Sequence, residues 1–543
     1  MAPTVVVLPC KALLQYSVIK KLRYRSVQFS LSRNPALLRS IASFAFITSL
    51  GLSAPMASKA QAASYELQGA GAYNASEILS YAAQIELQRA GSVTAEGIAR
   101  AIETIYREDG HFLAEARVAE NGRTIIIDEG EIGSISIEGV DQRTSALISG
   151  YFKPVIGKEG VTLAEFERAV MLTEDIQSIA ASTEIDYPDG QETAHVRIVA
   201  EQQDSSSGYV TLDNPSREFG DAATLTIGQE FVSLLTPGDL FRFELSGTAA
   251  FDGSEEDIYG SVIYRAPIGV SGTYGEVYLG NVVGDRDATG ELRQTDLKGN
   301  TAILAIGHPV VRNLDTYGYG LFELRRSSSD NDIDGVDTDF ETTVNVVSAS
   351  WIYGRALQNG GAFEYATNLS FGSRASDAEG FDDGDEDFWH LRAGVGYQQP
   401  VSWFGEHSAF SVEFWGQYTN DRLPGIEEFY LGGIDQERGF SFAEVQGDSG
   451  FSASFDAGRD LFPQNRNLRR ARPFGFLDMG YVKNNDPSTS EADDEFLSSV
   501  GLGVDLEFEN RIFARAYVAV PTTSGPDTES GDPALYLALS KSW

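Results

Sequence analysis

The feature that most constrains this chain is an alternation of apolar and polar residues that runs through most of its length. In residues 239–251 the odd positions include Phe241 and Phe243, whereas the even positions include Arg242 and Glu244. A period of two gives a β-strand with one apolar and one polar face. Strands of about ten residues with this pattern are typical of membrane-crossing barrels, whose polar face lines an aqueous lumen. The alternation therefore predicts a transmembrane antiparallel β-barrel; a soluble β-sandwich alternates too, but rarely needs so many long, aromatic-rich strands.

The strands can be counted from the same pattern. An even number brings both ends of a barrel to the side with short turns and leaves the long connections on the other side. The long connections are acidic, as in SDAEGFDDGDED and NNDPSTSEADDE, whereas the basic run RNLRRAR falls on a short one. We therefore expect about 16 strands over 205–543, with the long acidic loops outside the cell. The expected strands begin near residues 208, 222, 239, 258, 270, 296, 315, 339, 361, 388, 409, 447, 472, 495, 511 and 533.

Composition excludes several classes of function. The 543 residues carry a net charge of −38, and so acidic a surface repels the phosphate backbone of nucleic acids. Cys10 is the single cysteine, which excludes a disulfide scaffold, a zinc–thiolate site and a cysteine nucleophile downstream of it. The five histidines have no metal-ligand spacing, and no nucleophile-elbow or phosphate-loop motif occurs. We therefore expect no enzyme, no cofactor and no nucleic-acid partner.

The first 62 residues have the pattern of a secretory signal peptide. Basic residues without any acid are followed by an uncharged stretch, 40–58, and then by the A-x-A sequence Ala60-Gln61-Ala62. We expect residues 1–62 to be removed, which leaves a short N-terminal segment, 63–74. An N-terminal membrane anchor is the alternative, but the uncharged stretch is short for a spanning helix.

Two similar α/β units of about 65–70 residues precede the barrel. In the first, 75–130, apolar residues recur with helical period in two segments, and Asn121-Gly122 joins two short strands. In the second, 131–204, Thr162 and Glu165 form a capping box that opens a helix. The repeat resembles a tandem pair of POTRA domains, which are small periplasmic modules with βααββ order.

One acidic loop matches the spacing of a calcium-binding loop. Asp330, Asp332, Asp334 and Glu341 follow the pattern D-x-D-x-D-G-x5-E. Strands rather than helices are expected on both sides, and an acidic loop meets this pattern easily by chance. The loop is therefore a weak candidate, and we expect no bound metal.

A short motif lies in the longest outer connection of the expected barrel. The sequence FYLGGIDQERGF falls within this connection, which we place at about 421–446. Its Arg438, Gly439 and Phe440 resemble the (V/I)RG(F/Y) motif of POTRA–barrel transporters. In that superfamily the motif belongs to a lid loop that folds into the pore.

A second motif, FGFLDMGYV, lies on the thirteenth expected strand. Its Phe476, Asp478 and Gly480 resemble the F-x-D-x-G motif of the same superfamily, and the alternation turns all three toward the lumen. A carboxylate inside a barrel wall needs a cation, and an arginine on an inward-folded loop needs a carboxylate. We therefore predict that Arg438 contacts Asp478 and holds the lid loop inside the pore.

The start of the barrel indicates a branch of this superfamily. Residues 208–241, with Asp213 and Asn214, resemble the first barrel hairpin of two-partner secretion transporters, the TpsB proteins of ShlB/FhaC/HecB type. Two POTRA domains and sixteen strands are also the architecture of that family. The last strand ends in Trp543, which resembles the terminal aromatic signal read by the barrel-assembly machinery, although phenylalanine is more usual there.

The resemblance implies an outer-membrane pore of a Gram-negative cell, embedded in lipid, with its POTRA domains in the periplasm. These domains would capture a secreted partner protein (TpsA-like) in extended form, and the partner would pass through the lumen without ATP (type Vb secretion). An insertase for barrels or surface lipoproteins is the alternative: the strand count argues against it, while the lack of room for a plug helix leaves it open. A passive porin is opposed by the lid motif.

Overall fold

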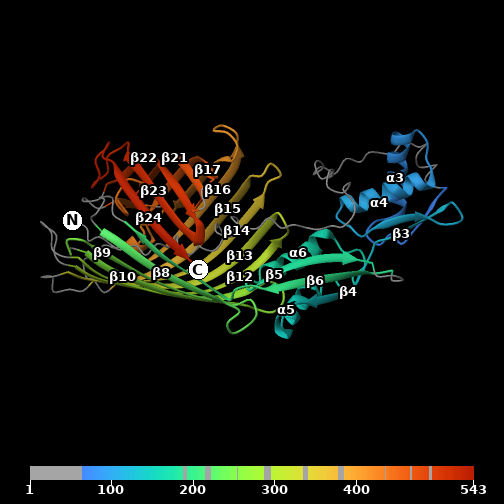
Figure 1. Cartoon of the computed structure of the whole chain (residues 1–543), viewed down its shortest axis with the longest axis horizontal. Coiled ribbons are helices and arrows are strands. Elements are labelled where there is room, and N and C mark those ends of the chain that lie inside the picture. Colours follow the sequence, from blue (N-terminus) through green and yellow to red (C-terminus); the bar gives the residue numbers. More distant parts are fainter. Residues whose placement is uncertain are drawn as a thin grey trace. The chain divides into compact units, whose positions relative to one another are not determined.

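The computed structural model describes residues 64–543 except 188–191, 215–221, 254, 287–294, 334–339, 377–383, 435, 465–466 and 488–491. The expected signal peptide and Asp334 lie outside the described residues. The chain forms two compact units that divide near Asp204, a smaller N-terminal unit with helices and a larger unit of strands (Figure 1). In the described part of the chain, no helix is long and apolar enough to cross a membrane.

The first half of the N-terminal unit is a three-stranded sheet with two helices. Its elements are β1 (Glu66–Gln68), α3 (Ala75–Ala90), α4 (Ala95–Glu108), β2 (Glu115–Val118) and β3 (Thr124–Asp128). The sheet order is β1-β3-β2, with β1 parallel to β3. Asn74 and Thr94 cap the helices, because their side chains accept hydrogen bonds from backbone N–H groups of the first turns. The helices and the hairpin were expected; the three-residue strand β1 was not.

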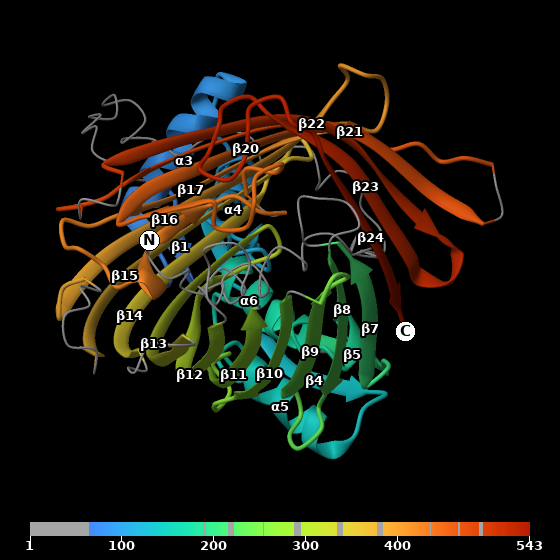
Figure 2. The same ribbon diagram turned by 90° about the vertical axis from the view of Figure 1, so that its left-hand side faces the viewer.

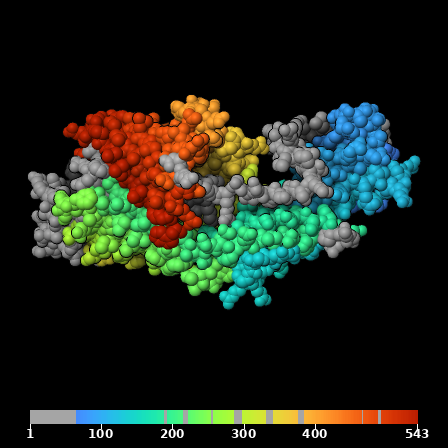
Figure 3. Space-filling model, in the orientation of Figure 1, coloured from blue at the N-terminus to red at the C-terminus, as the bar shows by residue number. Residues whose placement is uncertain are grey.

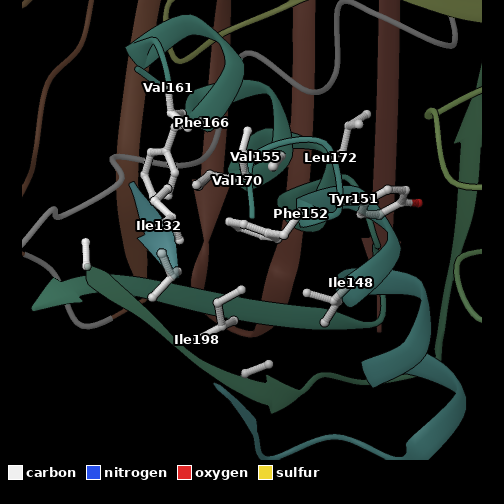
Figure 4. Close-up of a cluster of buried hydrophobic side chains, with 14 of the residues drawn as sticks. Ile132, Ile148, Tyr151, Phe152, Val155, Val161, Phe166, Val170, Leu172 and Ile198 are labelled. Carbon is white, nitrogen blue, oxygen red and sulfur yellow. The ribbon is translucent and has the colours of Figure 1, made fainter. Parts of the chain in front are cut away.

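The second half repeats this order. Its elements are β4 (Ile132–Glu138), α5 (Gln142–Phe152), α6 (Leu163–Glu174), β5 (Ile179–Asp186) and β6 (Ala194–Gln202), with sheet order β4-β6-β5. The expected capping box opens α6, since the Thr162 hydroxyl and the Glu165 carboxylate each accept from the other residue's backbone N–H. Figure 4 shows the core, where Phe152 and Phe166 from the helices face Ile198 of the sheet.

A buried carboxylate ties the first helical hairpin to the end of its sheet. Glu129 accepts hydrogen bonds from the backbone N–H groups of Gly71 (2.6 Å) and Ala72 (2.7 Å) and from the Tyr106 hydroxyl (2.8 Å). Burial and this hydrogen bond raise the pKa of Tyr106 well above its ordinary value, so the phenol remains protonated. The first residue of α6, Leu163, donates its N–H to the carbonyl of Gly110 (2.7 Å), which joins the two halves of the unit.

The C-terminal unit is a closed barrel of sixteen antiparallel strands, as the sequence predicts. Each strand pairs with its neighbours in chain order, and the last pairs with the first. Figure 2 shows the long strands β10 to β17 side by side in the wall. The strands are β7 (Ser206–Asp213), β8 (Ala222–Val232), β9 (Leu240–Ala250), β10 (Glu255–Pro267), β11 (Tyr274–Arg286), β12 (Thr295–Arg312), β13 (Thr316–Ile333), β14 (Phe340–Ala356), β15 (Ala362–Ser376), β16 (Asp387–Val401), β17 (Ser408–Tyr418), β20 (Ser449–Arg459), β21 (Leu468–Lys483), β22 (Asp494–Phe508), β23 (Ile512–Pro521) and β24 (Ala534–Ser542).

Alternation along the strands divides the side chains between two environments. On β22, Leu502 points outward and is 74% exposed, whereas Ser499, three residues earlier and of opposite parity, is fully buried on the lumen side. Outward apolar side chains of this kind form the lipid-facing band of a membrane barrel. Several strands continue beyond the length that a membrane requires: β13 has 18 residues and includes part of the acidic stretch that the sequence places in a loop. The β13–β14 ladder continues into this stretch, where Asp330 lies opposite Glu341.

The buried core of the second α/β half should control the stability of that half. Replacing Phe152, which is fully buried, with alanine should lower its free energy of unfolding by about 3–5 kcal/mol, because the cavity cannot refill. All five tryptophans lie in the barrel unit, so their fluorescence does not report on this region. Hydrogen exchange of residues 132–202 in increasing urea would measure the loss, with Tyr81→Ala, at a residue 48% exposed, as the control expected to change little. Equal effects of the two substitutions would contradict this description of the core.

Candidate functional site

A long loop between β17 and β20 packs on the lumen side of the barrel wall. It contains the 3-10 turn η2 (Gly425–Glu427) and a small hairpin of β18 (Phe429–Leu431) and β19 (Val445–Gly447). Both strands of this hairpin pack against β21. We refer to residues 419–448 as the lid loop; the sequence places it at about 421–446.

The structure brings Arg438 of the lid loop onto Asp478 of β21. The guanidinium binds the carboxylate in bidentate fashion, with Nε to Oδ2 at 2.7 Å and Nη2 to Oδ1 at 2.7 Å. The backbone N–H of Arg438 also donates to Oδ2, at 3.1 Å. Two parallel charge-assisted hydrogen bonds are among the strongest and most directional polar contacts in proteins. The Asp478 side chain is only 2% exposed, so the guanidinium of Arg438 rather than water compensates its charge.

Two residues of β20, which the sequence analysis did not single out, complete the site. Arg438 donates from Nη1 and Nη2 to the Asp456 carboxylate, each at 3.2 Å, and from Nη2 to the Ser454 hydroxyl at 3.0 Å. The Ser454 hydroxyl also donates to Asp478 Oδ1 at 2.7 Å. Alternation could have identified both residues, because Ser454 lies directly opposite Asp478 in the β20–β21 ladder and Asp456 is two positions along on the same face.

The aromatic residue of the wall motif supports the guanidinium from its face. The Cζ atom of Arg438 lies 3.5 Å from the centre of the Phe476 ring, a cation–π contact. Phe476 is itself held edge-on by Tyr517 of β23, with ring centres 5.7 Å apart. The planar guanidinium is thus held by carboxylates at its edge and by a ring on its face, a combination that lysine cannot provide.

The other motif residues, Gly439, Phe440 and Gly480, allow the lid loop to pack closely against the wall. Gly439 has a φ of +103°, a conformation that favours glycine, and its neighbour Phe440 is fully buried. Phe440 packs in an apolar cluster with lid residues Leu431 and Val445 and with Val482 and Leu497 of the wall. Gly480 leaves room for this cluster, because a Cβ atom at residue 480 would lie 2.6 Å from Leu431 Cδ2 and 2.5 Å from Glu437 Oε1.

Further contacts connect the lid loop to neighbouring loops at the same end of the barrel. Glu444 accepts hydrogen bonds from the Asp527 N–H (2.9 Å) and the Thr528 hydroxyl (2.8 Å), both in the loop between β23 and β24. Asp448 accepts from the backbone N–H groups of Leu423 and Asn485, each at 2.6 Å. These contacts join segments far apart in the sequence, and no local pattern marks them.

The remaining expected site residues lie where the barrel closes. Strands β7 and β24 share five ladder pairs, one of them Asp213 with Ala538. Beyond that point Asn214 continues the pairing with its side chain, which accepts from Leu537 N–H (2.6 Å) and donates to the Leu535 carbonyl (2.9 Å). At the opposite end, the Trp543 indole donates to Gln229 Oε1 (3.2 Å). Figure 3 shows the first strands (green) and the last strands (red) adjoining at this closure.

The structure describes the side chains of two of the four weak calcium candidates, Asp330 and Glu341. In the described part of the chain, no group of three or more potential metal ligands is close enough to hold an ion. Asp330 lies in β13 and Glu341 in β14, whereas Asp334 lies outside the described residues.

Comparison with known proteins places the chain in a family. Residues 192–506 match the model of the haemolysin secretion/activation proteins ShlB/FhaC/HecB. The chain belongs to this family. It is therefore an outer-membrane transporter of two-partner secretion, and the family implies a secreted partner protein of TpsA type. No curated protein matches the sequence.

Solved structures with the same fold support the architecture. CdiB from Escherichia coli has 17% sequence identity and a TM-score of 0.74, with 98% of this chain and 97% of that chain covered. CdiB from Acinetobacter baumannii has 13% identity and a TM-score of 0.68, with 88% of this chain and 89% of that chain covered. At such identities these matches support the fold, including the N-terminal α/β region that is consistent with POTRA domains.

The close packing of the lid loop against Gly480 can be tested by substitution. Gly480→Ala should displace Leu431 and Glu437, and the resulting overpacking should weaken docking of the loop by about 1–3 kcal/mol. Trypsin should then cut the purified protein after Arg438 faster than it cuts the wild type. Gly320→Ala is the matched control, because a Cβ atom at that position meets no atom within 4 Å. Equal resistance of both variants to trypsin would show that the loop does not rest on Gly480.

Proposed function

We propose that the lid loop is the gate of this transporter, and that export requires it to leave the lumen. The observation that carries this proposal is the bidentate contact of Arg438 with Asp478 on the inner wall of a closed barrel. The contact joins a loop to a strand and takes no part in the hydrogen bonds that close the barrel. The loop can therefore be released without opening the wall.

The contacts that hold the lid loop on the wall can break and form again. Each hydrogen bond is noncovalent, and water or the passing chain can replace it once the loop moves. A buried ion pair is costly to break by removal of one partner, because the other charge stays behind. Release of the loop differs from such a removal, because Arg438 leaves with its loop and uncovers Asp478 to the lumen, so both charges regain water.

The N-terminal unit provides surfaces for the partner before it enters the pore. We place its two halves in the periplasm as POTRA domains, at about 75–130 and 131–204 with β1 completing the first sheet, after removal of residues 1–62. Strands β2 and β5 lie at the edges of their sheets. An edge strand offers unpaired backbone groups, so an extended partner segment can bind by adding a strand.

The polar lumen suits an unfolded chain in transit. Its inner face carries charged and hydroxyl side chains, such as the Arg242–Glu230 ion pair between β8 and β9. Transfer would need no ATP, since folding of the partner outside the cell would make it directional. No catalytic role is proposed for any residue.

Planar-bilayer conductance of the purified full chain tests the gate. Arg438→Ala and Asp478→Ala should each increase open-channel conductance or flicker, because each removes one partner of the same contact. The double variant should add little to either single change, since the contact is already lost. Glu230→Gln, which removes a lumen ion pair away from the lid loop, is the control.

The opposite pattern would contradict the gate. If the two single variants and the wild type conduct alike, the lid loop does not limit the pore. If the single effects add in the double variant, Arg438 and Asp478 act separately and the pair is not the lock.

A further inference from the structure

The lid loop is docked a second time, at its base, on a different part of the wall. Before η2, Leu423 is 1% exposed and packs with Val344 and Val346 of β14 and Phe388 of β16. Ile426 lies against the same cluster. This base cluster is separate from the tip cluster around Phe440, which lies on β21 and β22.

A fully buried carboxylate lies at the centre of the base. Glu427 has no exposed surface, and its Oε1 atom lies 2.6 Å from Arg325 Nη2 of β13. Its Oε2 atom lies 3.2 Å from His390 Nε2 and 3.7 Å from Arg392 Nη2, both on β16. A carboxylate so completely removed from water requires compensating cations, and the wall provides two arginines.

The backbone at the base is held by the same part of the wall. The Glu427 carbonyl accepts from Arg392 Nη2 (2.9 Å) and from Gln417 Nε2 (3.1 Å). The Gln417 amide also donates to the Asp448 carbonyl (2.9 Å), so one side chain of β17 holds the backbone at Glu427 and the last residue of the lid loop. Arg392 and Gln417 are joined in turn by a hydrogen bond from Nε to Oε1 (2.5 Å).

The two docking sites have the same design and use different strands of the wall. Each combines an apolar cluster with a buried ionic contact to the lid loop. Arg438 binds residues of β20 and β21, whereas Glu427 binds residues of β13 and β16. Their signs are also opposite: the tip brings a cation to wall carboxylates, and the base brings a carboxylate to wall arginines.

We propose that Glu427 is a second anchor of the lid loop, a positioning residue that holds its base independently of Arg438 at its tip. This inference deepens the proposed gating function and rests on it only for its consequence for transport. Release of the tip alone leaves the loop tethered across the β13–β16 wall. The loop clears the lumen only when Arg325 and Arg392 also lose Glu427.

Two native trypsin sites report on the two anchors separately. Arg422 lies at the base, where the N–H of Leu423 is bound by Asp448, and Arg438 lies at the tip. Glu427→Gln keeps the shape of the side chain and removes its charge. Purified full-length Glu427→Gln should be cut after Arg422 at least tenfold faster than the wild type, while the bond after Arg438 remains protected.

The matched variant at the tip should show the reverse. Asp478→Asn retains the Arg438 cleavage site, and it should expose that bond while the bond after Arg422 stays resistant. Glu427→Gln/Asp478→Asn should expose both. Glu276→Gln is the control, because it removes a charge from a wall ion pair with Arg265 (2.6 Å) that lies away from the lid loop, and it should leave both bonds protected.

Each outcome decides between the alternatives. If Glu427→Gln is as resistant after Arg422 as the control, Glu427 is not an anchor, and the gate proposed for Arg438 is unaffected. If either single substitution exposes both bonds together, the loop docks as one unit and the proposal of two anchors is wrong. Retention of the heat-modifiable barrel band in gel electrophoresis shows that each variant is folded.

Planar-bilayer conductance then tests whether the pore opens fully only when both anchors are lost. Each single substitution should produce brief partial openings, whereas Glu427→Gln/Asp478→Asn should produce long openings well beyond the sum of the single effects. A double variant that conducts like Asp478→Asn alone would show that the base does not restrain the lid loop. Unchanged conductance in all variants, combined with separate exposure of the two trypsin sites, would overturn the gating function and leave the two anchors in place.

Discussion

The contact between Arg438 and Asp478 is the interaction on which the docked position of the lid loop depends. A sixteen-stranded barrel is too wide for its own side chains to fill, so something else must occupy the lumen if the pore is to be closed. Here a loop of the chain itself occupies part of it. An inward-folded loop can be held only by contacts with a polar wall, and a bidentate arginine–carboxylate pair supplies both strength and direction.

The inner face of β20 and β21 carries the side chains that bind the tip of the lid loop. Alternation places Ser454, Asp456 and Asp478 on the same inner surface of β20 and β21, so three oxygen-bearing side chains converge on one guanidinium. Phe476 precedes Asp478 by two positions and therefore lies beside it on the same face. The residues between them, such as Leu477, point outward, and their apolar side chains contact lipid. Alternate residues of one strand thus contact the membrane and the docked lid loop.

The sequence predicts the barrel well because period two is a local signal that every strand repeats. The sixteen expected strand starts lie within a few residues of those in the structure, and the inward direction of Asp478 follows from parity alone. The family resemblance of the two motifs then indicated which loop arginine to pair with Asp478.

What the sequence did not reveal depends on contacts between distant segments. Glu427 is one acid among 79 Asp and Glu residues, and nothing near it in the sequence distinguishes it. It becomes recognisable only when the fold brings Arg325 and Arg392 from two strands to its carboxylate. Strand β1 was missed for a similar reason, since three residues carry no periodic signal and the strand exists through its parallel pairing with β3.

A disulfide that locks the tip of the lid loop is the most direct test of the central claim that the loop must leave the lumen. A Cβ atom at Gly439 would lie 3.1 Å from the Cβ atom of Ala519 on β23, so the two Cβ atoms of Gly439→Cys/Ala519→Cys must move apart by about half an ångström to reach disulfide geometry. The φ of +103° at Gly439 strains any side chain placed there, and the reduced form of the same variant carries the same strain and is the control. Cys10→Ser removes the single native cysteine from the background. Export of the partner protein by the oxidised variant should stop and should return on reduction. Equal export by the oxidised and reduced forms would contradict the account, because the partner would then cross with the lid loop still in place.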